Sequence, residues 1–173
     1  MSQTRLEVIM NEKAMKGPMA KRDPESNIWA HSPAKTEIPE DVIFVDLLRC
    51  TGCWTCSLSC MTGNGLPDGR YFVNVRTLGS GEGIDRPAGT WPDLHMSWMP
   101  YYTHHCIKCK PRTEQGELPY CVKNCPNKAL YYGADAAEKI EAARRRGARI
   151  YQLPEWEHGK DGVIYASPDR EII

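Results

Sequence analysis

Short apolar runs alternate with polar, turn-rich stretches along most of the chain, as is typical of small strands and helices joined by loops. Residues 41–48, DVIFVDLL, are rich in β-branched and aromatic side chains and predict a strand that ends just before the first cysteine. Every second residue is apolar or β-branched over residues 71–77, YFVNVRT, which predicts a second strand. Residues 127–133, NKALYYG, predict a short third one.

The pattern changes to a helical one in two places. Residues 57–62 predict a short helix, and residues 134–146, ADAAEKIEAARRR, contain strong helix formers with Gly147 at the position of a C-cap. The arginines at 144–146 would lie in the last turn, where positive charge suits the helix dipole. Residues 149–153 and 162–167 are β-like and predict a terminal hairpin. These elements together indicate an α+β fold with short strands and helices.

Two stretches are set apart by their place in the domain: an N-terminal arm and an insertion that includes the 71–77 strand. Residues 1–40 mix charges with prolines and predict a long extended N-terminal arm, which is either a disordered tail or a strap that uses Trp29 as an anchor on a partner. Residues 66–103 predict an insertion that contains a glycine-rich loop at 78–89. Its aromatic residues form either a jacket that keeps water off a cofactor or a surface for another subunit. These aromatic residues are Trp91, Trp98, Tyr101 and Tyr102.

Composition excludes several classes of protein. The chain has 173 residues, which fits one domain with extensions, and its 22 basic and 22 acidic residues cancel, so no overall charge favours nucleic acid. No apolar run approaches the roughly 18 residues of a membrane span, and residues 1–22 lack the apolar segment of a secretory signal. A hydrophobic content of 41% and a mean hydropathy of −0.53 predict a thin core that depends on bound metal.

The cysteine pattern carries the chemistry. The first four cysteines are spaced C-x2-C-x2-C-x3-C, and the last four are spaced C-x2-C-x11-C-x3-C and followed by proline. Three thiolates two residues apart can surround three corners of a cubane iron–sulfur cluster, and in two-cluster ferredoxins the fourth cysteine of such a run binds the other cluster. The cofactor-binding residues predicted from this pattern are Cys50, Cys53, Cys56, Cys60, Cys106, Cys109, Cys121 and Cys125.

Two other uses of the cysteines compete with this one. A disulfide framework expects secretion and dispersed spacings, and the close C-x2-C steps do not suit it. A structural zinc ion could be bound by the C-x2-C pairs at 50/53 and 106/109, but that leaves four cysteines without a role. His104 and His105 precede a cysteine directly, and with eight thiolates present they are expected beside the ligands rather than among them.

The two cysteine motifs resemble those of a known family. Residues 44–69, FVDLLRCTGCWTCSLSCMTGNGLPDG, and residues 104–133, HHCIKCKPRTEQGELPYCVKNCPNKALYYG, are similar to the first and last motifs of the iron–sulfur electron-transfer (beta) subunits of dimethyl sulfoxide reductase-type molybdopterin oxidoreductases. The resemblance covers about residues 42–167. That family usually has two further motifs between these, which this chain lacks, so the resemblance implies a shortened form with two [4Fe-4S] clusters in one ferredoxin-like module.

The resemblance also implies which cysteines act together. The ligands cross between the motifs, so that each cluster takes three cysteines from one motif and one from the other. Cluster 1 would be held by Cys50, Cys53, Cys56 and Cys125, and cluster 2 by Cys60, Cys106, Cys109 and Cys121. The implied domain organisation is the arm at residues 1–40 followed by a dicluster domain at 41–173, with the 66–103 insertion and a C-terminal helix plus hairpin.

The function implied by the resemblance is electron transfer without catalysis. The chain would relay electrons to or from a molybdopterin-containing catalytic subunit in a heterodimer or a multiple of it, with a soluble electron donor as a further partner. The alternative is a free dicluster carrier of the ferredoxin type. Lys108, between two ligands, would either favour the reduced state of its cluster or lie in solvent. The expected location is the cytoplasm, or the periplasm if the subunit is exported with a partner.

Overall fold

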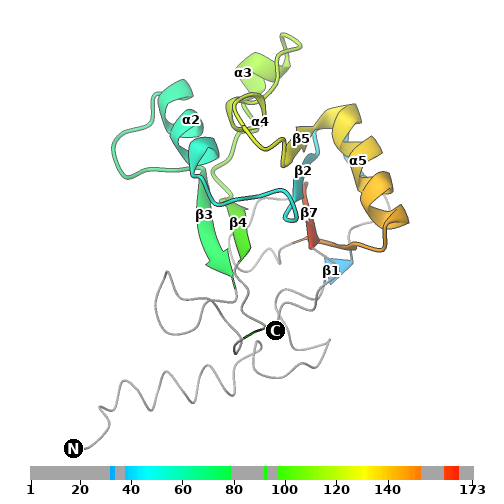
Figure 1. Ribbon diagram of the computed structural model, residues 1–173. Coiled ribbons are helices and arrows are strands. Elements are labelled where there is room, and N and C mark those ends of the chain that lie inside the picture. The colour runs from blue at the N-terminus through cyan, green and yellow to red at the C-terminus, as the bar shows by residue number, and fades with distance from the viewer. Residues whose placement is uncertain (1–31, 34–37, 79–91, 93–96, 153–161, 168–173) are drawn as a thin grey trace, which may run out of the picture.

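The computed structural model describes residues 32–33, 38–78, 92, 97–152 and 162–167, which form a mixed α+β fold (Figure 1). The α+β class predicted from the sequence is therefore confirmed. The strands are β1 (Ser32–Pro33), β2 (Ile43–Asp46), β3 (Val73–Leu78), β4 (Ser97–Tyr102), β5 (Leu130–Tyr132), β6 (Arg149–Gln152) and β7 (Val163–Ser167). The helices are α2 (Thr55–Gly63), α3 (Lys110–Thr113), α4 (Tyr120–Lys123) and α5 (Gly133–Arg145).

A five-stranded sheet with the order β1-β6-β7-β2-β5 forms the centre of the fold. β6 and β7 pair antiparallel, which confirms the predicted terminal hairpin. β7 also pairs with β2, and this pair is parallel. The parallel pairing was not predicted, because it joins segments more than 100 residues apart and only long-range packing selects it. As a result, the end of the chain supports the strand that enters the first cysteine loop.

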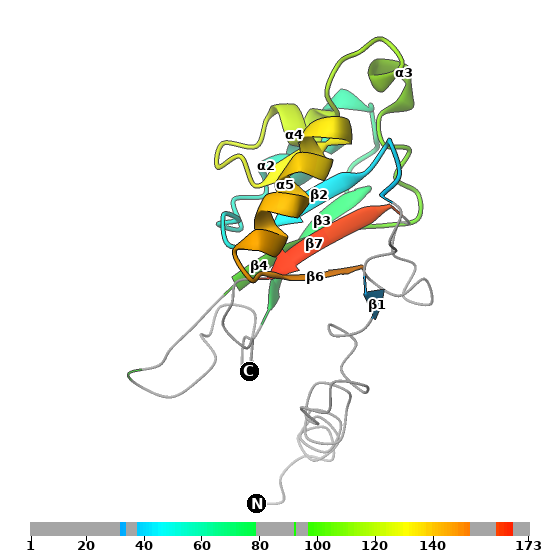
Figure 2. The ribbon, with the colours of Figure 1, turned by 90° about the vertical axis from the view of Figure 1, so that its right-hand side faces the viewer.

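The two faces of this sheet bury different partners. Val42 and Phe44 pack with Ile140 of α5 in one buried cluster, whereas Ile43 and Val45 belong to a second cluster that contains buried cysteines. This separation follows from the period of two along a strand, which directs successive side chains to opposite faces. Figure 2 shows α5 lying across the face of the sheet. The sheet thus separates an ordinary aliphatic layer from the cysteine-containing layer.

A two-stranded sheet, β3–β4, closes the other side of the cysteine layer. β3 agrees with the prediction for residues 71–77, but β4 lies in the aromatic stretch, where no strand was predicted. The pairing of Val73 with Tyr102 brings the end of β4 beside the start of β3. Tyr101 and Tyr102 are buried and Trp98 is half-buried, which favours the jacket over the exposed subunit surface for these three residues.

The helices agree closely with the predicted ranges. α2 begins two residues before the predicted helix, directly after Trp54, which has a left-handed backbone. α5 matches the helix predicted at 134–146, and Gly147 follows it with a φ of +82°, as a C-cap glycine should. The short helices α3 and α4 in the second cysteine motif were not predicted as separate elements.

Several predictions lie outside the described residues. They concern most of the N-terminal arm with Trp29, and the glycine-rich loop with Trp91. Within the arm, only β1 and residues 38–40 are described, and β1 pairs antiparallel with β6. The domain boundaries at 40/41 and the limits of the 66–103 insertion stay predictions.

Candidate metal centre

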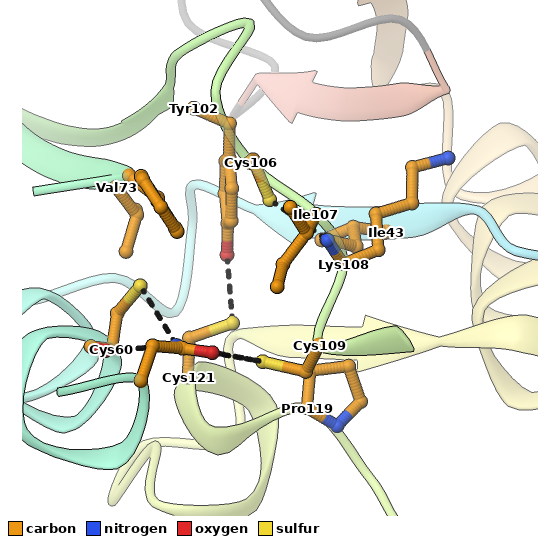
Figure 3. A pocket seen from close by; sticks show the side chains of 12 residues that line it. Ile43, Cys60, Val73, Tyr102, Cys106, Ile107, Lys108, Cys109, Pro119 and Cys121 are labelled. Carbon is orange, nitrogen blue, oxygen red and sulfur yellow. Dashed lines mark hydrogen bonds between the residues drawn. The ribbon is translucent and has the colours of Figure 1, made fainter. Parts of the chain in front are cut away.

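The eight cysteines divide between two pockets, with four thiols in each. The first pocket, the Cys50 pocket, contains Cys50, Cys53, Cys56 and Cys125. The second, the Cys60 pocket, contains Cys60, Cys106, Cys109 and Cys121 and is shown in Figure 3. They enclose about 310 and about 270 Å³ of space, respectively, partly open to solvent. Each pocket therefore combines three thiols from one sequence motif with one from the other, which is the grouping of the crossed ligand sets that stay a prediction.

Helix α2 explains how one motif can serve both pockets. Cys56 and Cys60 are four residues apart on α2, so they lie one helical turn apart along its axis. Cys56 lines the Cys50 pocket and Cys60 lines the Cys60 pocket. The second motif repeats this arrangement, because Cys121 lies within α4 and Cys125 lies just beyond its end. The two short helices thus set the offset between the pockets.

Unusual backbone conformations occur in the cysteine loops. Trp54, Lys108, Cys109 and Lys128 have φ values between 49° and 61°, and they are the non-glycine residues with positive φ in the described part of the chain. Left-handed backbone at such residues costs of order 1–3 kcal/mol each and is tolerated mainly at functional sites. Two of these loops also direct amides at sulfur: the N–H of Lys108 donates to Cys106 Sγ at 3.4 Å, and the N–H of Ala129 donates to Cys125 Sγ at 3.3 Å.

Burial and mutual repulsion raise the pKa of several of these thiols and so favour their protonated form. Burial, with a smaller contribution from the neighbouring Cys50, raises the pKa of Cys56 to about 12. Burial likewise raises the pKa of Cys60 to about 11, with smaller contributions from Cys106 and Cys109. Because cysteine binds metal as the thiolate, a metal cation bound in these pockets would displace protons from the thiols. The repulsions follow the same grouping of thiols as the pockets.

Cys53 differs from these thiols, because it is exposed. The little burial it has raises its pKa, but hydrogen bonds with Thr55 and with nearby backbone lower the pKa by more, so that the net shift is downward. Cys53 Sγ and Thr55 Oγ1 are 3.4 Å apart. Cys50 is half-buried, and its pKa is raised by burial, although a hydrogen bond with the Gly52 backbone opposes this. The Cys50 pocket therefore has one side that faces solvent.

The Cys60 pocket has polar side chains that the sequence reasoning missed. The Tyr102 hydroxyl lies 3.5 Å from Cys121 Sγ, and both groups are buried. Asn64, at the C-terminal end of α2, places its Nδ2 3.6 Å from Cys60 Sγ and 3.8 Å from Cys109 Sγ. The sequence showed only an Asn-Gly turn signal at 64–65 and an aromatic run at 101–102. No local pattern indicated that either side chain faces sulfur.

The structure excludes one of the two roles considered for Lys108, the solvated lysine, whereas its effect on the reduced state of a cluster stays a prediction. Its side chain is only 7% exposed, so it is not a solvated lysine. Its Nζ forms an ion pair with Asp41 Oδ1 at 2.9 Å, and in Figure 3 the side chain runs away from the sulfur atoms. The charge that Lys108 presents to the pocket is therefore offset by Asp41. Asp41, which precedes β2, is a charged residue near this pocket that the sequence reasoning missed.

The alternative ligand sets are not assembled. The zinc site would need Cys50 and Cys53 beside Cys106 and Cys109, but these two pairs line different pockets. His104 and His105 are exposed and line neither pocket. Over the described ranges, no group of three or more His, Cys, Asp or Glu residues is arranged to hold a single metal ion.

The pockets fit a polynuclear iron–sulfur cluster by their donor chemistry. Thiolates are the ligands of such clusters, four to a [4Fe-4S] cluster, and each pocket contains four cysteines around a cavity. The Ser57 hydroxyl, next to Cys56 in the chain, is buried and forms no well-aligned hydrogen bond among the described residues, although its proximity lowers the pKa of Cys56.

Comparison with known proteins places these motifs in context. No protein-family model matches the chain. An iron–sulfur protein assigned to a dimethyl sulfoxide reductase of Halobacterium salinarum is 33% identical, over 62% of this chain and 39% of that protein. A subunit of the selenate reductase of Mesobacillus selenatarsenatis is 29% identical, over 62% of this chain and 31% of that subunit. The arsenate respiratory reductase iron–sulfur subunit from a Shewanella species is 32% identical, over 50% of this chain and 30% of that subunit.

These similarities confirm the resemblance that the two cysteine motifs predicted. The chain is similar in sequence to the iron–sulfur subunits of reductases of the dimethyl sulfoxide reductase type. The match spans less than half the length of these relatives. Within the described part of the chain, no helix has the length and apolar character needed to cross a lipid bilayer.

Proposed function

We propose that this chain is a non-catalytic electron-transfer subunit that holds two [4Fe-4S] clusters and relays electrons to or from a molybdenum or tungsten pterin catalytic subunit. The observation that carries the proposal is the division of eight thiols into two pockets of four, across two motifs that are distant in the sequence. The similarity to iron–sulfur subunits of several reductases supports the same role. A [4Fe-4S] cluster supplies one-electron transfer when it is bound.

The chain's own residues would hold, insulate and polarise the clusters. Cysteine thiolates supply the bonds to iron, and the N–H groups of Lys108 and Ala129 donate to two of the sulfurs. The buried side chains of Val73 and Tyr102 keep water from the Cys60 pocket. The Cys50 pocket opens to solvent at Cys53, which makes it the side from which a partner could come closest to a cluster.

The first test is the cluster content. Protein prepared without oxygen should contain about eight iron atoms per chain and show the brown absorption of cubane clusters, because each pocket has four thiols. An iron content well below this value would contradict the two-cluster proposal. A colourless protein that contains zinc would replace it with a structural metal site.

The crossed ligand sets are tested by a matched pair of substitutions around α4. Cys125→Ser should remove the cluster of the Cys50 pocket, and Cys121→Ser should remove that of the Cys60 pocket, although both residues belong to the second motif. Electron paramagnetic resonance of the reduced variants would show which signal remains. Loss of the same signal in both variants would contradict the crossed assignment.

The partner is tested by purification from native cells. Recovery with a molybdopterin-containing subunit, as a heterodimer or a multiple of it, would support the proposal, and recovery as a lone monomer would favour the free ferredoxin-type carrier.

For location, we propose the cytoplasm, since the reducing conditions there keep cysteines available as thiols. Cell fractionation would test this, and recovery from the periplasm would instead indicate export together with a partner.

A further inference from the structure

We infer that the buried hydroxyl of Tyr102 raises the reduction potential of the cluster in the Cys60 pocket by donating a hydrogen bond to the sulfur of Cys121. The inference rests on the proposed function, because it requires a cluster in that pocket. It goes beyond that function by assigning the control of one cluster's potential to one side chain. Tyr102 is a positioning and tuning residue in this role and not a ligand.

The geometry of the contact is the first support. Tyr102 Oη lies 3.5 Å from Cys121 Sγ, within hydrogen-bond range of sulfur. Tyr102 is 1% exposed and Cys121 is 5% exposed, so water does not compete for either group. In Figure 3 the ring stands at the edge of the pocket with its hydroxyl directed at Cys121. Tyr102 pairs with Val73 of β3 at the end of β4, which fixes its backbone.

The direction of the effect follows from the chemistry of the two groups. A thiolate bound to iron has no proton, so it can only accept, and the tyrosine hydroxyl must be the donor. The reduced cluster carries one more negative charge than the oxidised one, and a hydrogen bond to a charged acceptor stabilises it more strongly. Hydrogen bonds to the sulfurs are among the features that set the potentials of such clusters. Removing the Tyr102 hydroxyl should therefore lower the potential.

The comparison with the other pocket makes the effect specific. In the Cys50 pocket the hydroxyl of Thr55 lies 3.4 Å from Cys53 Sγ, and this pair is exposed to water. Water can replace an exposed hydrogen bond at little cost, whereas a buried one has no replacement. Asn64 also approaches two sulfurs of the Cys60 pocket, but at 3.6 and 3.8 Å. Tyr102 thus approaches sulfur in the Cys60 pocket more closely than Asn64 does, and its hydroxyl is buried.

The test is a redox titration of Tyr102→Phe, followed by electron paramagnetic resonance. The signals are assigned by the loss of one of them in Cys121→Ser. Tyr102→Phe should lower the potential of the cluster in the Cys60 pocket by about 59 mV, which is a tenfold change in the ratio of reduced to oxidised cluster for a one-electron couple. The potential of the cluster in the Cys50 pocket should stay the same.

The matched control is Tyr165→Phe. Tyr165 is also almost fully buried, but its hydroxyl donates to the carbonyl oxygen of Pro100 at 3.0 Å rather than to sulfur. Tyr165→Phe loses buried hydrogen bonding to Pro100 and to the Tyr102 backbone but none to sulfur, so only an effect through sulfur would separate the potentials of the two variants. An unchanged potential in Tyr102→Phe, or equal shifts in the two variants, would overturn the inference.

A second substitution covers the case in which Tyr102→Phe does not assemble the cluster. Site-specific replacement of Tyr102 by 3-fluorotyrosine keeps the ring and makes the hydroxyl more acidic and a stronger donor. The potential should then rise, which is opposite to the effect of phenylalanine, and a fall or no change would contradict the inference. If wild-type protein contains two clusters but neither substitution shifts a potential, the inference fails alone; if wild-type protein contains none, the proposed function fails.

Discussion

The two cysteine pockets are built from the same number of thiols but differ in exposure. All four cysteines of the Cys60 pocket are buried, and Tyr102 and Asn64 approach its sulfurs. In the Cys50 pocket, Cys53 is exposed and Cys50 is half-buried. Trp54 beside them is 46% exposed. The difference indicates a division of roles in which one pocket would insulate the proposed cluster and the other would keep an open side.

The difference arises from what covers each loop. Tyr102, at the end of β4, forms a wall of the Cys60 pocket. The first cysteine loop, at residues 50–54, lies at the surface, and it is held by Arg49, whose side chain donates to the Asn127 carbonyl at 3.2 Å. Gly52 lies against the Trp98 ring and Gly63 against the Tyr120 ring, so substituting each glycine provides a way to disturb one pocket separately from the other.

The largest expected effect is that of Gly52→Ala on the Cys50 pocket. Gly52 has a φ of +69°, and a Cβ there would lie 2.5 Å from the Trp98 ring. The substitution should lower the free energy of unfolding by about 1–3 kcal/mol through overpacking, in addition to the cost of left-handed backbone. It should also reduce cluster occupancy in the Cys50 pocket. Denaturant unfolding and iron analysis would measure both.

Gly116→Ala is the matched control for Gly52→Ala. Gly116 has a similar φ of +77°, but an added Cβ would meet nothing within 4 Å. Gly116→Ala therefore has the same cost of left-handed backbone as Gly52→Ala but lacks the clash with an aromatic ring. If both variants lost the same stability, the contact between Gly52 and Trp98 would not matter, and the Cys50 loop would be less constrained than the structure indicates.

A smaller effect is expected for Gly63→Ala, which acts on the Cys60 pocket. Gly63 ends α2, and a Cβ there would clash with the Tyr120 ring of α4. Alanine normally favours a helix over glycine by about 1 kcal/mol. We expect the clash to outweigh this gain, so that Gly63→Ala lowers the free energy of unfolding by about 1 kcal/mol. Thermal or denaturant unfolding would measure it.

A double-mutant cycle sharpens the Gly63 experiment. In a Tyr120→Ala background the ring is absent, so Gly63→Ala should cost less or become stabilising. The same cost in both backgrounds would show that the close approach of α2 and α4 does not depend on this glycine. The cluster of the Cys60 pocket, rather than that of the Cys50 pocket, should be the one affected.

The smallest expected effect is kinetic. When the isolated chain is exposed to ferricyanide or a chelator, the cluster of the Cys50 pocket should be lost several times faster than the cluster of the Cys60 pocket. The reason is that oxidation of cysteine ligands follows their exposure. Loss of the two paramagnetic signals over time would measure the rates. Equal rates, or faster loss from the Cys60 pocket, would contradict the division between an open and an insulated pocket.

Much of the local structure could be predicted from the sequence. The strand before the first cysteine, the helix of α5 and the terminal hairpin were all correct, since alternating apolar residues and helix-forming runs are local signals. β4 was missed because its sequence, SWMPYY, contains proline and does not alternate. The parallel pairing of β2 with β7 was missed because it is set by contacts between distant segments.

The sequence alone determined the donor chemistry: the number of thiols, their spacing and the resemblance that this spacing carries. The resemblance also implied which thiols share a pocket, whereas tertiary structure decided which thiols face water and which side chains approach sulfur. The roles of Tyr102, Asn64 and Asp41 belong to this second group. The physical reason is that spacing limits which atoms a short segment can bring together, whereas burial and hydrogen bonding between distant segments exist only after the chain has folded.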